Sequence, residues 1–243
     1  MIDDEQLAAS SVVANCSMNR ERGLTGRDGY ARVLGVDLRE TLVRRLAEPG
    51  PVVRWLDLCC GRGNALLEMV SLLRARGLAD RVRVTGVDLV PHFADAPPPE
   101  VRFVVAPVAE WRPEHRFDLI TCVHGLHYVG DKLGVLAATA SWLTTDGELA
   151  ANFDATSVRS ADGAPLGRRL TKALRDAGFD YDGRTRRIRR HGHADVRLPF
   201  TYLGADDKAG PNYTGQPAVH SHYDPRRPPV TSAQPAPSTA ITR

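Results

Sequence analysis

A short glycine turn between a predicted strand and a predicted helix constrains the fold more than any other stretch of this chain. Residues 55–64 read WLDLCCGRGN, and ALLEMVSLLRARG follows directly. A strand that leads through glycines into a helix presents backbone N–H groups and the positive end of the helix to a ligand. The stretch therefore predicts an α/β fold with a ligand site at the carboxyl end of a strand.

Strands and helices alternate downstream of this turn. Predicted strands cover residues 52–58, 81–89, 101–106, 117–125 and 147–154, and predicted helices cover 64–77, 133–144 and 164–179. The stretches 184–192 and 194–204 also read as strands, and the short gap between them requires an antiparallel pair. The pattern predicts a doubly wound, mostly parallel seven-stranded sheet with an antiparallel terminal hairpin.

Three regions follow from this pattern. Residues 1–50 are expected to form a helical N-terminal lid segment, with one helix burying apolar residues between positions 33 and 46 before Pro49-Gly50-Pro51. Residues 51–204 form the predicted ligand-binding core. Residues 205–243 form an extension in which 209–224 is aromatic enough to pack on the core near the site, and 224–243 is expected to be disordered.

Several classes of protein are disfavoured by the sequence. No apolar run approaches the roughly 20 residues that span a bilayer, and the start MIDDEQLAAS lacks the features of a signal peptide, so we expect a cytoplasmic protein without a membrane partner. The four cysteines show no CxxC spacing, and a bond between adjacent Cys59 and Cys60 would be strained. Reduced thiols and no metal site are therefore expected.

The residues around the turn indicate which ligand it holds. The dinucleotide pattern needs a third glycine where this chain has Leu66, and no Gly-Lys-Ser/Thr follows as in a phosphate-binding loop. Two acids remain, Asp57 in the turn region and Asp88 at the end of the next strand. They suit an adenosyl amino acid, whose ribose diol an acid at the tip of the second strand can bind.

Four motifs in succession give the chain a family resemblance. WLDLCCGRG, VTGVDLV, RFDLITCVHGLHYVGD and LTTDGELAANFD together resemble the motifs of class I S-adenosylmethionine-dependent methyltransferases. The resemblance covers roughly residues 50–204 and implies S-adenosyl-L-methionine as the methyl donor. It also implies donor-binding roles for residues at or just beyond the carboxyl ends of the strands, namely Asp57, Cys59, Gly61, Gly63, Asp88, Leu89, Val108, Ala109 and Cys122.

Two positions depart from the family pattern. Cys59 stands at the first glycine of the usual D-x-G-x-G-x-G, and we expect the turn to accept a small side chain there if φ is negative. Ala106 replaces the polar residue that often follows the third strand, so adenine recognition there would rest on backbone groups.

Three side chains are candidates for the chemistry of methyl transfer. His124 leaves the fourth strand where the resemblance places the methyl group, and a histidine titrates in the range useful for a general base. His127 is either a catalytic group or part of the pocket wall. Asp154 ends the fifth strand, where it either binds a substrate amine or caps a loop.

Two further regions bear on partners. Within residues 19–30, Tyr30, Arg20 and Arg22 are candidates to fold over the donor, or the stretch is a solvated entry loop. The strand at 184–190 is rich in arginine and could bind phosphates. However, only Lys132, Lys172 and Lys208 are lysines among 32 basic residues, which indicates a compositional bias toward arginine throughout the chain.

The predicted function is methyl transfer to an O or N atom of a small molecule, in secondary metabolism by family analogy. We expect no nucleic-acid partner; the acceptor and the oligomeric state stay open. One alternative is an RNA- or protein-modifying methyltransferase that docks through residues 184–190. Another is a methyltransferase-fold interaction protein without catalytic activity.

Overall fold

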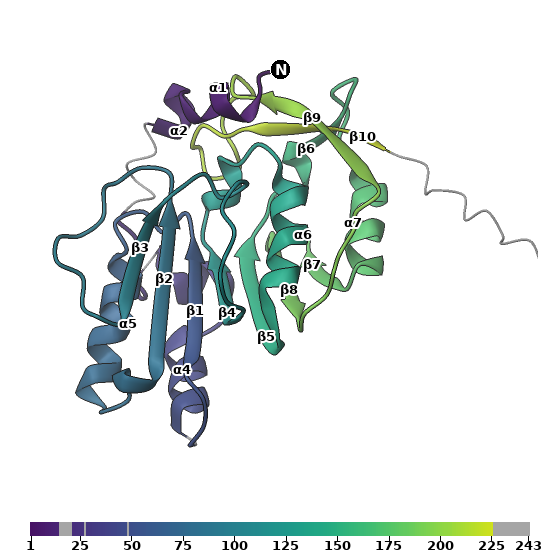
Figure 1. The fold of residues 1–243 in the computed structure, drawn as a ribbon. Coiled ribbons are helices and arrows are strands. Elements are labelled where there is room, and N and C mark those ends of the chain that lie inside the picture. The colour runs from purple at the N-terminus through teal and green to yellow at the C-terminus, as the bar shows by residue number, and fades with distance from the viewer. Residues whose placement is uncertain (15–20, 27, 48, 226–243) are drawn as a thin grey trace, which may run out of the picture.

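The computed structural model, which describes residues 1–14, 21–26, 28–47 and 49–225, is built on a seven-stranded sheet (Figure 1). The strand order is β3-β2-β1-β4-β5-β8-β7. The strands are β1 (Val53–Leu58), β2 (Val82–Asp88), β3 (Val101–Val105), β4 (Phe117–Cys122), β5 (Leu143–Asn152), β7 (Phe179–Asp182) and β8 (Arg187–His191). β8 is antiparallel to both of its neighbours, and the pairs from β3 to β5 are parallel. The predicted fold class is therefore confirmed.

Helices cover both faces of this sheet because the strands are apolar on both sides. Trp55 of β1 packs in one hydrophobic cluster with α3 (Tyr30–Leu34), α4 (Leu38–Ala47) and α5 (Asn64–Ala75). Its neighbour Leu56 points to the opposite face and packs with α6 (Lys132–Trp142) and α7 (Gly167–Asp176). Short 3-10 helices are η2 (Ala79–Arg81), η3 (Gly125–His127) and η4 (Ala155–Ser157).

The single N-terminal helix predicted across residues 33–46 is wrong in one respect, because the structure divides it into α3 and α4. Gly35 ends α3 in the left-handed region with φ 65°, and its N–H donates to the carbonyl of Ala31. A left-handed residue at this position closes a helix, and glycine adopts that conformation without a steric penalty. The buried face continues through Leu34 and Leu38 on either side of the break.

The predicted terminal hairpin is also misplaced. The strands that pair at the edge of the sheet are β7 and β8, whereas 194–204 was expected to pair with 184–192. Asp182 begins the turn between them by accepting the backbone N–H of Arg184 at 2.9 Å. The last predicted strand exists as β9 (Phe200–Asp206), but it belongs to a different sheet.

That second sheet has the order β6-β10-β9 and joins distant parts of the chain. It contains β6 (Val158–Ser160) and β10 (His220–Pro225). The helices α1 (Asp4–Ala8) and α2 (Ser11–Ala14) lie beside it at the top of Figure 1. Ile2 forms a bridge to Ala205 of β9, and Tyr202 donates a 2.7 Å hydrogen bond to Asp4.

A buried lysine holds the extension against the core. The ammonium of Lys132 donates to the carbonyls of Val129 (3.0 Å) and Val219 (2.8 Å) and to the hydroxyl of Ser221 (2.8 Å). Burial lowers the pKa of this lysine to about 7. Residues 219–223 therefore pack on the core, whereas the predicted disordered tail lies outside the described residues from residue 226 onward.

Two general features complete the fold. None of the described helices is both long enough and apolar enough to cross a membrane. Cys59, Cys60 and Cys122 are free thiols, and Cys16 lies outside the described residues.

Candidate functional site

The turn after β1 is tightly folded because three of its residues have positive φ. The φ angles are 56° at Cys59, 60° at Gly61 and 79° at Gly63. A Cβ atom on Gly63 would lie 2.3 Å from the ring of Phe103, so only glycine fits there. The condition placed on Cys59, a negative φ, is wrong: the cysteine adopts the left-handed conformation that the family's glycine would adopt.

Asp88 ties this turn to the end of β2. One of its carboxylate oxygens accepts the backbone N–H of Gly61 at 2.8 Å, and the other accepts that of Val90 at 3.1 Å. Each carboxylate oxygen has more than one acceptor site. Asp88 therefore keeps acceptor capacity for a ligand in the cavity that it lines.

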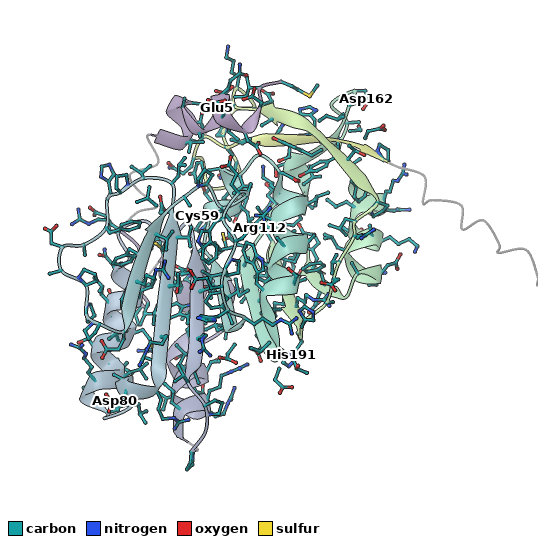
Figure 2. The ribbon with its side chains drawn as sticks, viewed as in Figure 1. Glu5, Cys59, Asp80, Arg112, Asp162 and His191 are labelled. Atoms are coloured by element: carbon teal, nitrogen blue, oxygen red, sulfur yellow. The ribbon has the colours of Figure 1, made fainter. Side chains whose placement is uncertain are left out.

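The first cavity lies at the carboxyl ends of β1, β2 and β4, underneath α1. It encloses about 120 Å³, against about 10–15 Å³ for one water on the same measure. In Figure 2 Cys59 lies at this end of the sheet, and Glu5 on α1 lies above it. Its walls are mostly apolar, with Leu7 and Val13 from the N-terminal helices opposite Leu89 and Val108.

Half of the predicted site residues line this first cavity. They are Cys59, Gly61, Asp88, Leu89, Val108, Ala109 and His124. The stretch 107–110, expected to flank adenine, lines it completely. The predicted residues that do not line it are Asp57, Gly63, Cys122, Tyr30, Arg22, His127 and Asp154.

Asp57 is enclosed behind the turn. It is fully buried, accepting hydrogen bonds from the hydroxyl of Tyr30 at 2.7 Å and from that of Thr121 at 2.5 Å. Burial raises the pKa of its carboxyl to about 7, although both hydrogen bonds oppose that shift. Tyr30 thus connects the N-terminal region to the end of β1, and its own pKa is raised by burial and by Asp57.

A second cavity of about 410 Å³ lies beside the first. It is lined by Asp28, Arg32, Val33, His124, Asn152, Thr185, Arg187 and Tyr213. Its walls come from the N-terminal region, the end of β5, the β7–β8 turn and the C-terminal extension. Of all these residues, His124 alone also lines the first cavity.

Asn152 at the end of β5 organises the polar groups between the cavities. Its Oδ1 accepts the backbone N–H of His124 at 2.5 Å, and its Nδ2 lies 3.1 Å from Nδ1 of the same residue. Nδ2 is also 3.3 Å from Nε2 of His127 and donates to the hydroxyl of Tyr213 at 3.1 Å. Burial lowers the pKa of both imidazoles to about 3.

Asp154 takes the loop-capping role that was one of its two predicted roles. Its carboxylate accepts the backbone N–H of Thr156 at 3.0 Å and the hydroxyl of the same residue at 2.7 Å. Arg186 lies 3.8 Å from this carboxylate and 4.1 Å above the ring of Tyr213. Asp154 therefore supports the wall of the second cavity without lining it.

Within the predicted N-terminal lid segment, α1 and α2 are the helices that line the first cavity. Arg22 donates to the backbone carbonyl of Asp28 at 3.0 Å, and Arg20 lies outside the described residues. The residues that cover the first cavity are instead Asp4, Leu7, Ala8 and Val13. The capping box formed by Asp3 and Gln6 is a sequence signal that could have indicated a helix there.

Comparison with known proteins decides the family. A family model described as a methyltransferase domain matches residues 30–183, which is more than half of the chain. The chain belongs to the class I S-adenosylmethionine-dependent methyltransferases. The match agrees with the family resemblance of the sequence motifs.

Curated relatives of the methyltransferase match a shorter stretch. A trans-aconitate 2-methyltransferase from Enterobacter sp. (strain 638) is 40% identical over 98 residues, and one from Escherichia coli O7:K1 is 34% identical over 97 residues. Each match covers 39% of this chain and 36% of the relative. The chain thus spans well under two thirds of the length of these relatives.

Solved structures resemble the methyltransferase more distantly. The N-methyltransferase NodS from Bradyrhizobium japonicum WM9 is 15% identical, covering 75% of this chain and 99% of that chain with a TM-score of 0.43. The amino pentose methyltransferase CalS10 from Micromonospora echinaspora is 24% identical, covering 48% and 49% of the two chains with a TM-score of 0.36. At these scores neither likeness bears on function.

The first cavity of the methyltransferase suits the chemistry of S-adenosylmethionine. Asp88 offers a carboxylate for a diol, and apolar walls such as Leu89 and Val108 suit an adenine ring. The turn at Gly61 brings backbone close to the same space. These residues are the ones that would hold the donor, which supplies a methyl group bound to a positively charged sulfur.

Sequence reasoning missed Asn152, whose amide contacts His124, His127 and Tyr213. It stands two residues before Asp154 in an otherwise apolar stretch, LAANF. An amide at the carboxyl end of a buried strand must find partners, because an unsatisfied buried polar group is costly. That burial argument was the available signal.

Proposed function

We propose that this methyltransferase transfers a methyl group to an O or N atom of a small molecule, with the donor in the first cavity and the acceptor in the second. The observation that carries the proposal is that His124 lines both cavities. A residue shared by both cavities marks where donor and acceptor groups can meet. Methyl transfer requires such a meeting point because attack on the methyl carbon is in line.

On the donor side, we propose that Asp88 binds the ribose diol and that residues 107–110 flank the adenine. Asp57 and Tyr30 stay proposed for the methionine end together with the glycine turn. They act from behind the turn, since their mutual hydrogen bond is buried. Gly63, Cys122 and Arg22 also stay proposed donor residues, supported by the family resemblance.

On the acceptor side, we propose a molecule that carries a carboxylate. Arg32 lines the second cavity and gives it positive charge, which Asp28 partly offsets. Arg187 also lines it and adds charge, although its Nε and Nη2 already donate to carbonyls of α3. Guanidinium groups suit planar carboxylates. The curated relatives are named for trans-aconitate, a carboxylate anion, which agrees with this charge.

The structure gives less support to nucleic-acid docking through residues 184–190. Arg187 and Arg189 donate to backbone carbonyls of α3 and of Gly35 just beyond its end, and Arg190 donates to those of Ala177 and Gly192. These guanidinium groups therefore already have partners within their own chain. β8 lies between β5 and β7, and these contacts favour a structural role for its arginines over phosphate binding.

The role of Asp88 is tested by donor binding. We expect Asp88→Ala to weaken S-adenosylmethionine binding about tenfold or more in calorimetry, since it removes hydrogen bonds to a charged acceptor worth about 1.5–3 kcal/mol. Asp80→Ala is the matched control, because Asp80 is exposed and lies at the opposite end of the sheet from Cys59 (Figure 2). An unchanged dissociation constant for Asp88→Ala would refute the assignment.

The acceptor class is tested by supplying donor with a labelled methyl group to panels of small molecules. We expect label in compounds that bear carboxylates, and less label after Arg32→Met. Label in neutral amines only would overturn the carboxylate proposal while leaving methyl transfer intact. An absence of donor binding at millimolar concentration would favour the interaction-protein alternative.

Two finer predictions stay predictions. A place in secondary metabolism rests on family analogy. A cytoplasmic location rests on sequence features alone. Each is tested in the native cell, the first by the metabolites lost on gene deletion and the second by fractionation.

A further inference from the structure

We propose that Asn152 holds His124 in the neutral form that carries its proton on Nε2, so that His124 donates a hydrogen bond where the two cavities meet and does not act as a base. This inference rests on the proposed function for what the N–H would meet. Its structural part concerns the free protein alone. Asn152 is a positioning residue in this proposal, because it acts through His124.

The orientation of the Asn152 amide is fixed by a group that can only donate. The backbone N–H of His124 points to one end of the amide at 2.5 Å, so that end must be the carbonyl oxygen. The NH₂ group is then at the other end. Amide orientations are often ambiguous, but a backbone partner removes the ambiguity.

The NH₂ group in turn fixes the proton on the imidazole. It lies 3.1 Å from Nδ1 of His124 and 3.1 Å from the hydroxyl oxygen of Tyr213. Because an NH₂ group has no lone pair to offer, Nδ1 must accept and cannot carry a proton. A neutral imidazole without a proton on Nδ1 carries it on Nε2.

His127 also contacts the NH₂ group of Asn152, at a longer distance than His124 and Tyr213 do. Its Nε2 lies 3.3 Å from the same NH₂ group, which has only two protons for three acceptors. The hydrogen bond to His127 is therefore shared or weak, and the two contacts at 3.1 Å are the main ones. By the same argument, Nε2 of His127 carries no proton while it accepts from Asn152.

The charged groups near His124 also favour its neutral form. Burial acts most strongly, followed by Arg22 and His127, while Asp28 acts in the opposite direction. Around His127, burial acts together with Lys132, Arg186 and Arg22. The pKa of each imidazole is lowered to about 3, so neither ring holds an extra proton near neutral pH.

This form of His124 has a consequence for the acceptor. Among the described residues, Nε2 of His124 has no hydrogen-bond partner, and the ring lines both cavities. A bound acceptor would therefore meet an N–H group in place of a lone pair. Transfer to a carboxylate oxygen suits this, since one O–C bond forms, the sulfur–methyl bond breaks and no proton has to leave.

The proton position is tested on the full chain by NMR with ¹⁵N-labelled histidine, without any ligand. We expect His124 to show an unprotonated Nδ1 and a protonated Nε2, with no titration between pH 5 and 8. The variant His124→Gln assigns its signals. A proton on Nδ1, or a titration near pH 6.5, would overturn the proposal.

The role of Asn152 is tested by Asn152→Asp. A carboxylate accepts a proton from Nδ1, so we expect the proton to move from Nε2 to Nδ1 and the titration midpoint of His124 to rise by about 1–3 pH units. Asn212→Asp is the matched control, because it adds the same charge at the residue that precedes Tyr213, where Oδ1 accepts from the backbone N–H and the hydroxyl of Thr214. Equal spectra for the two variants would show that Asn152 does not set the tautomer.

The two proposals fail separately in these experiments. If S-adenosylmethionine does not bind, the proposed function fails while the tautomer of His124 is unaffected. If the tautomer is the other one, this inference fails while donor binding stands. Should Asn152→Asp not fold, the wild-type spectrum alone still decides the proton position.

Discussion

At the scale of single residues, the turn after β1 places an acid in a dry environment. Asp57 is buried, and among the described residues the hydroxyls of Tyr30 and Thr121 are the hydrogen-bond partners of its carboxyl group. Its pKa of about 7 means that it is protonated below neutral pH and ionised above it. Since a folded pKa above the unfolded value near 3.9 favours folding at low pH, this contribution is lost as the pH rises from about 4 to about 7.

The hydroxyl of Tyr30 should therefore matter more at high pH. We expect Tyr30→Phe to lower the free energy of unfolding by about 1.5–3 kcal/mol at pH 8, where the acceptor is charged, and by about 0.5–1.5 kcal/mol at pH 5.5. Urea unfolding at the two pH values measures both. Tyr181→Phe is the control, because that hydroxyl accepts from the backbone N–H of Ala155 at 3.3 Å and, among the described residues, donates no hydrogen bond to a carboxylate. Equal losses for Tyr30→Phe at both pH values would contradict the ionisation of Asp57.

Cys59 gives a second prediction at this scale. Its φ of 56° is costly for a branched side chain, whereas glycine adopts it freely. We expect Cys59→Val to lower the free energy of unfolding by about 1–2 kcal/mol and Cys59→Gly to change it by less. Denaturant unfolding of the two variants checks the order. Equal free energies of unfolding for Cys59→Val and Cys59→Gly would contradict this prediction.

At the scale of elements, β8 holds the end of α3. Arg187 donates to the carbonyls of Val33 (2.9 Å) and Arg32 (2.8 Å), and Arg189 donates to those of Leu34 and Gly35 (both 3.1 Å). These are among the carbonyls that a helix leaves without partners at its carboxyl end. Two cations there also complement the helix dipole.

Removing these contacts should loosen α3 selectively. We expect Arg187→Met with Arg189→Met to lower the free energy of unfolding by about 1–2 kcal/mol and to speed amide exchange in α3. Arg184→Met is the matched control, since Arg184 is exposed in the β7–β8 turn. Unchanged exchange in α3 would show that the arginines do not hold it.

The elements also show how far sequence reasoning reaches. Strands β1, β2 and β4 were predictable because each is a short apolar run followed by an acid, a glycine or a polar turn. The β7–β8 hairpin was not predictable from the sequence. The alternation of apolar and polar residues in FDYD is too short to indicate a strand, and the stretch resembles the end of the preceding helix. β9 was found, but its pairing with β10 depends on contacts between residues about 20 positions apart that no local pattern specifies.

In the candidate site, too, the residues that belong to local motifs were predictable, and those that come together only in the folded chain were not. Asp88 and Gly61 follow directly from local motifs, and both line the first cavity. The second cavity brings together Asp28, Asn152 and Tyr213, which are far apart in the chain and belong to no common motif. The positive φ of Cys59 was also not predictable from the sequence, because the size of a side chain alone does not specify φ.

At the scale of the whole molecule, two buried histidines make the free energy of unfolding depend on pH. His124 and His127 have folded pKa values of about 3, below the unfolded value near 6.5. The unfolded chain therefore binds two more protons than the folded chain between these values, and stability falls as the pH falls. Asp57 opposes this with one proton between about pH 4 and 7.

The net effect is testable with one variant. From these three groups we expect the free energy of unfolding to fall by about 1.4 kcal/mol per pH unit between pH 6 and 4.5. His127→Gln should remove about that slope, whereas His92→Gln, at an exposed position, should not. Unfolding curves across this range measure the slope. The same slope in all three proteins would contradict the burial of His127 in its neutral form.

The second sheet also determines when the site can form during synthesis. β10 pairs with β6 across more than 60 residues, Val219 donates its backbone N–H to the carbonyl of His127 at 2.9 Å, and Tyr213 closes the second cavity. A nascent chain that has emerged only as far as β8 can complete the seven-stranded sheet but not this wall. The turn and strand ends that form the floor of the proposed donor cavity can thus assemble on the ribosome before the wall of the proposed acceptor cavity exists, whereas α1, which covers the donor cavity, gains its contacts with β9 only later.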